Sequence, residues 1–137
     1  MADFVMWYRE GGWGMHLVFL MNLFAMAGVP LALLLAIVAR ATGKMGGVAR
    51  VAAILGTMLA AAPCCAGIIG YNSAMWKTES AAEYVDPKKK SWLLRMGGEE
   101  ASHNLNFGVG SALCMLLPSV LAFVIAPSKP PPPEPEY

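Results

Sequence analysis

The chain has 137 residues, of which 57% are hydrophobic and only 14% charged, whereas soluble domains usually carry about 25% charged residues. Ten basic and nine acidic residues give a formal net charge of +1, so the overall charge does not favour binding to nucleic acid. Three cysteines are too few for a disulfide framework, and their spacing fits no zinc motif. This composition predicts a small integral membrane protein.

Residues 1–15 precede the first apolar stretch and mix aromatic residues with glycines. Trp7 and Trp13 lie in this segment, and tryptophan prefers the headgroup level of a bilayer, where its ring and its N–H are both satisfied. We expect a short interfacial segment that leads into the first helix. Trp76 and Trp92 are expected on the same side of the membrane, which predicts a Trp-rich outer layer of protein there.

Three apolar stretches are long enough to cross a bilayer, which takes about 20 residues. They cover residues 16–38, 51–71 and 107–126, and none of them contains Asp, Glu, Lys or Arg. The first is too long for the apolar core of a signal peptide, so we expect it to remain as a membrane span. Residues 16–126 are therefore predicted to form an all-α transmembrane domain with three transmembrane helices.

The link between the second and third spans, residues 72–106, is long enough to hold structure outside the membrane. Asp86 and Pro87 suit the start of a helix, as its N-cap and its first helical residue. The pair Gly97 and Gly98 suits the end of a helix. The residues between place their apolar side chains on one face, which predicts a short amphipathic helix on the membrane or against the bundle.

Basic residues indicate how the chain is oriented, because loops rich in lysine and arginine stay in the cytoplasm. The short link after the first span holds Arg40, Lys44 and Arg50 without an acid, whereas the link 72–106 balances five basic residues with five acidic ones. We therefore expect the N-terminus outside and the C-terminus in the cytoplasm.

The tail, residues 127–137, is dominated by prolines. Consecutive prolines favour an extended polyproline II conformation, which serves as a spacer or as a docking segment. We expect a disordered tail, with binding to a partner as the alternative.

Small residues recur at helical spacing in the second and third spans, a pattern that lets helix backbones approach closely in a membrane. We expect them at helix contacts, either within the chain or between copies or other membrane subunits, with assembly through the second span. These candidate packing residues are Ala52, Gly56, Ala60, Ala66, Gly70, Gly108 and Ala112.

Polar side chains are few inside the spans, and Asn22 and Thr57 stand out. A polar group in hydrocarbon needs a partner, so hydrogen bonds between helices are expected by default. An ion pathway normally uses an intramembrane acid, histidine or lysine, and His16 at the edge of the first span is the one candidate. We find no catalytic constellation, and we expect neither enzymatic activity nor a cofactor.

The three cysteines, Cys64, Cys65 and Cys114, all lie within the spans. Cysteine in such a position usually packs as a small hydrophobic residue. A metal-handling protein that uses these cysteines and the methionines is the alternative interpretation.

Residues 4–29, FVMWYREGGWGMHLVFLMNLFAMAGV, resemble the start of MotA/TolQ/ExbB proton-channel subunits. The pair Gly56-Thr57 is similar to the glycine–threonine motif of that family's pore helices, and residues 66–74 resemble the end of its last span. The resemblance implies an accessory or channel-like subunit of a bacterial inner-membrane complex, with Thr57 as a pore residue and with copies of itself or other membrane subunits as partners.

The chain departs from the family in three respects. Its first two spans are joined by a short link instead of a large cytoplasmic insertion, and no acidic residue accompanies the threonine. In addition, the segment 66–74 closes the second span here and not the last one. The alternative is a non-transporting structural membrane subunit that stabilises a larger complex through its Trp-rich outer layer and its Pro-rich tail.

Overall fold

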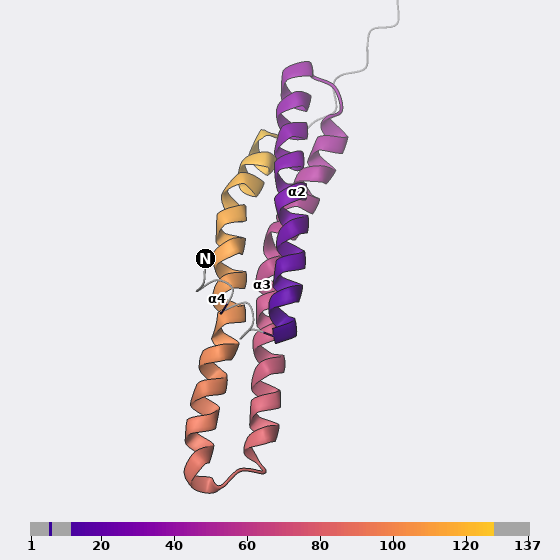
Figure 1. The fold of residues 1–137 in the computed structure, drawn as a ribbon. Helices are drawn as coiled ribbons and strands as arrows, with labels where there is room; N and C mark the ends of the chain where they lie inside the picture. The colour runs from indigo at the N-terminus through magenta and orange to yellow at the C-terminus, as the bar shows by residue number, and fades with distance from the viewer. Residues whose placement is uncertain (1–5, 7–11, 128–137) are drawn as a thin grey trace, which may run out of the picture. The chain divides into compact units, whose positions relative to one another are not determined.

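The computed structural model describes Met6 and residues 12–127. Within them the chain forms three long helices, α2 (Gly12–Thr42), α3 (Gly46–Ala82) and α4 (Pro87–Ile125), joined by short turns (Figure 1). No strand occurs among these residues, and each helix is long and apolar enough to cross a membrane. The prediction of an all-α fold with three such helices is confirmed. Most of the N-terminal segment with Trp7, and the tail beyond residue 127, lie outside the described residues.

The helices are longer than the apolar stretches that they contain. They have 31, 37 and 39 residues, which correspond to about 46, 55 and 58 Å at about 1.5 Å per residue. The hydrocarbon core of a bilayer is only about 30 Å thick. The helices are thus longer than a membrane span needs. Most of the link 72–106 is helix, and only residues 83–86 form the turn between α3 and α4.

The chain divides into two compact units, and each takes parts of all three helices. Unit 1 comprises Met1–Leu23 and Ala62–Ala112, and unit 2 comprises Phe24–Ala61 and Leu113–Tyr137. Each unit is described by itself below.

Unit 2 is packed around alanines. Its buried cluster, against which Leu33, Ala52 and Ile125 pack, consists of Ala32, Ala36, Ala53, Ala122 and Ala126. The large apolar side chains of this unit point outward instead, as Phe24, Leu117 and Val124 do. Small side chains inside and large ones outside suit helices in lipid, because the acyl chains are as apolar as the side chains that they cover.

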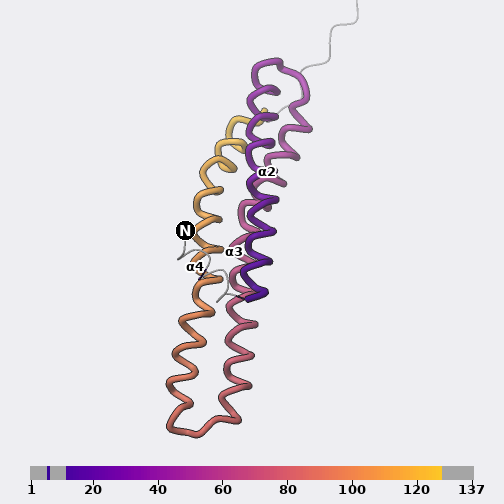
Figure 2. Tube along the Cα trace, viewed as in Figure 1, coloured from indigo at the N-terminus to yellow at the C-terminus, as the bar shows by residue number. Residues whose placement is uncertain are grey.

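In unit 1 the helices α3 and α4 continue beyond the start of α2. The indole N–H of Trp13 donates a hydrogen bond to the hydroxyl of Ser73 at 3.3 Å, so Ser73 is level with the first turn of α2. Figure 2 shows α3 and α4 running on side by side from this level to their turn. We call residues 74–100 the projecting hairpin.

The start of α4 agrees with the sequence, but the short helix predicted there does not exist as a separate element. The backbone N–H of Lys88 donates to the carboxylate of Asp86 at 3.0 Å, which is the expected N-cap. The helix then runs through Gly97 and Gly98 to Ile125 without a break. Gly97 permits close packing against α3, since a methyl group there would collide with the side chain of Thr78. A methyl group at Gly98 would lie 3.9 Å from the Sδ of Met75, an ordinary contact. Neither glycine ends the helix.

Candidate functional site

Four glycines bring the three helix backbones of unit 1 into direct contact. A methyl group at Gly14 of α2 would lie 2.7 Å from the Cα of Gly70 in α3, and one at Gly108 of α4 would lie 3.0 Å from the Cα of Gly67. The same methyl group at Gly108 would lie 2.5 Å from the carbonyl oxygen of Pro63. All four glycines are buried. We call Gly14, Gly67, Gly70 and Gly108 the glycine crossing.

Asn104 lies at the centre of this crossing and is completely buried. A methyl group at Gly14 would lie 3.1 Å from its Nδ2 atom, and one at Gly70 would lie 3.1 Å from its Cγ atom. The amide of Asn104 therefore occupies the space between α2 and α3, while its backbone lies against Gly67. A polar side chain held between helices in this way is typical of a specific contact in a membrane protein.

Sequence reasoning missed Asn104 because it placed this residue in the link 72–106. One signal could have found it. Asn104 precedes Gly108 by four residues, so the two share a helix face if the helix begins before residue 104. Gly14 and Gly67 were also missed, and only the fold brings them to the crossing.

The packing residues expected in the second and third spans are used inside the units. Gly70 and Gly108 belong to the glycine crossing, and a methyl group at Gly56 in unit 2 would lie 3.0 Å from the Cβ of Ala32. Ala60 and Ala66 are buried, whereas Ala52 and Ala112 are half-buried. Most of the small-residue face of α3 thus packs against the chain's own helices, while Ala52 also lines an open apolar groove on unit 2.

Asn22 and Thr57 bond within their own helices. The Nδ2 of Asn22, in unit 1, donates to the carbonyl oxygen of Val18 at 3.0 Å. The hydroxyl of Thr57, in unit 2, donates to the carbonyl oxygen of Ala53 at 2.9 Å. The expectation that these donors would bond across helices was therefore wrong, because each finds an acceptor one turn earlier in its own helix.

Two serines of α4 show the same arrangement. The hydroxyl of Ser111 donates to the carbonyl oxygen of Phe107 at 2.6 Å, and that of Ser119 donates to the carbonyl oxygen of Leu116 at 2.8 Å. Such back-bonding satisfies a hydroxyl in an apolar environment without a partner helix.

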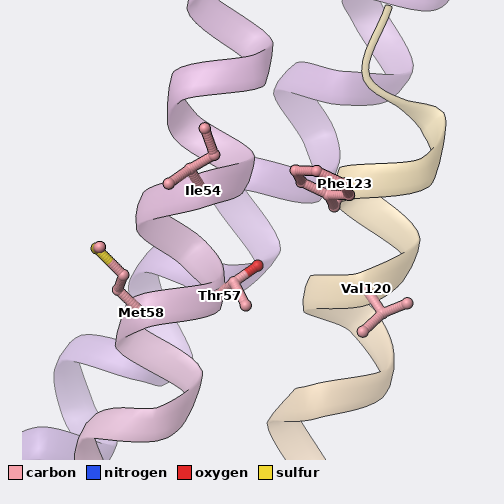
Figure 3. Close-up of a pocket in the computed structure, with 5 residues that line it drawn as sticks. All are labelled: Ile54, Thr57, Met58, Val120 and Phe123. Atoms are coloured by element: carbon pink, nitrogen blue, oxygen red, sulfur yellow. The ribbon is translucent and has the colours of Figure 1, made fainter. Parts of the chain in front are cut away.

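Thr57 lines an open apolar groove on unit 2 with a volume of about 310 Å³. Figure 3 shows Ile54, Thr57 and Met58 on α3, with Val120 and Phe123 opposite on α4. The hydroxyl of Thr57 is the one polar side-chain group among these five residues, and none of them titrates. The groove suits an apolar occupant and offers no ligand set for an ion.

The residues considered for metal binding are dispersed. Cys64 is half-buried, and Cys65 and Cys114 are exposed, all three as free thiols. The Nδ1 of exposed His16 lies 3.0 Å from the carbonyl oxygen of Gly12. No group of three His, Cys, Asp or Glu residues that could hold a metal ion occurs in the described part of the chain.

The tryptophans lie at different levels of unit 1. Trp13 is at the first turn of α2, whereas Trp76 and Trp92 lie on the projecting hairpin with 69% and 58% of their surface exposed. Trp92 is about 22 Å along α4 from Phe107, at about 1.5 Å per residue. In an upright helix this distance places Trp92 beyond the headgroup level. Trp7 lies outside the described residues.

Comparison of the chain with known proteins gave no matching family model, no matching curated protein and no matching solved structure.

Proposed function

We propose that the chain is an accessory subunit of a bacterial inner-membrane complex, which it stabilises without conducting ions and without enzymatic activity. One observation carries this proposal. The apolar stretches contain no acidic or basic side chain other than His16 at their edge, and Asn22, Thr57, Ser111 and Ser119 each donate to a carbonyl oxygen of their own helix. These groups form no polar path from helix to helix, which ion conduction normally needs.

The contacts of such a subunit would lie on its outer surfaces. Most of the small-residue face of α3 packs within the chain, so copies or other membrane subunits would bind mainly through the outward apolar side chains. The Trp-rich projecting hairpin would add contacts outside the membrane, and the Pro-rich tail would be available to a partner.

A channel-like subunit resembling the MotA/TolQ/ExbB family is the second candidate, and the position of Thr57 favours it. Thr57 lines an open groove and is not part of the alanine core of unit 2. If several copies assembled around this groove, the oxygen of Thr57 would line the space between them.

Proton flux separates the two candidates. In vesicles that contain the full chain, we expect the flux to equal that of protein-free vesicles, and Thr57→Val should change neither the flux nor the native mass of the complex extracted from its membrane. Thr57→Ser is the matched control, because it retains the hydroxyl. Flux that is lost in Thr57→Val and retained in Thr57→Ser would show a channel, and a chain extracted as a bare monomer would contradict the accessory role.

We propose in addition that the N-terminus lies outside and the tail in the cytoplasm. Arg40, Lys44 and Arg50 lie at or between the ends of α2 and α3, whereas Lys88–Lys90 lie at the far end of the projecting hairpin. Basic residues set orientation mainly within about 15–20 residues of a span. Lys88–Lys90 lie at the edge of this range, 17–19 residues before Phe107, so they count less than the residues that adjoin α2 and α3.

Protease access to tags tests this orientation. In intact spheroplasts, external protease is expected to remove a tag at the N-terminus and to leave a tag at the C-terminus in place. Permeabilised cells serve as the control, in which both tags should be cut. Removal of the C-terminal tag alone from intact spheroplasts would reverse the assignment.

A further inference from the structure

We draw no further inference here: the strongest candidate, the cavity of about 200 Å³ in unit 1 that Trp13 of α2, Lys77 of α3 and Glu100 of α4 help to line, holds two exposed side chains of opposite charge, and nothing in the described part of the structure shows what occupies it.

Discussion

Gly108→Ala is expected to lower the free energy of unfolding by about 3 kcal/mol, at the upper end of the usual cost of overpacking. The added methyl group would lie 2.5 Å from the carbonyl oxygen of Pro63 and 3.0 Å from the Cα of Gly67. Both of these are backbone atoms, so no side chain can rotate away from the methyl group. The substitution would force α3 and α4 of unit 1 apart.

Gly110→Ala provides the control for this substitution. Gly110 lies in the same helix and is exposed, and nothing lies within 4 Å of the methyl group that alanine would add. Its stability should change by less than about 1 kcal/mol, in the stabilising direction, since alanine favours helix over glycine. Unfolding with denaturant in mild detergent measures both variants. Equal losses of stability would show that the glycine crossing does not hold the helices together.

Asn104→Leu is expected to lower the free energy of unfolding by about 2–3 kcal/mol, through overpacking of a fully occupied site. Asn104 is completely buried, and its amide group lies between Gly14 and Gly70. Leucine carries two methyl groups where asparagine has a flat amide, and these cannot fit between backbones in contact. Asn104→Ala should cost about 2 kcal/mol, because it removes buried atoms and leaves a cavity.

Asn106→Leu is the corresponding control, since Asn106 is exposed two residues further along α4. It should change stability by less than about 0.5 kcal/mol, as is usual for surface substitutions. The same denaturant unfolding in detergent applies. A wild-type stability for Asn104→Leu would contradict the position of the amide between α2 and α3.

The three helices could be predicted because a long apolar stretch without charges usually crosses a bilayer as a helix, which bonds its own backbone N–H and C=O groups. The start of α4 could be predicted too, since the cap formed by Asp86 depends only on neighbouring residues. The length of the helices could not be predicted. Both α3 and α4 continue beyond the apolar stretches through segments that contain lysine, glutamate and alanine. Packing between the two helices stabilises them there.

The site was predicted only in part, because its contacts join residues distant in sequence. Gly97 and Gly98 look like a helix end when read locally, and only the contact of Gly97 with Thr78 shows that this glycine serves helix packing. Gly70 and Gly108 were identified from their spacing. Gly14 could not be paired with Gly70 from spacing, since the pairing requires the register of α2 against α3.

The glycine crossing also restricts how this chain can change during evolution. A protein often accommodates a larger residue when a neighbouring residue becomes smaller. Glycine already has the smallest side chain, so Gly67 cannot become smaller to make room for a larger residue at Gly108. The carbonyl group of Pro63, which also limits the space at Gly108, belongs to the backbone and is present whatever residue occupies that position. A substitution at Gly108 therefore has no nearby compensating substitution, and α3 and α4 can diverge freely only at positions away from this contact.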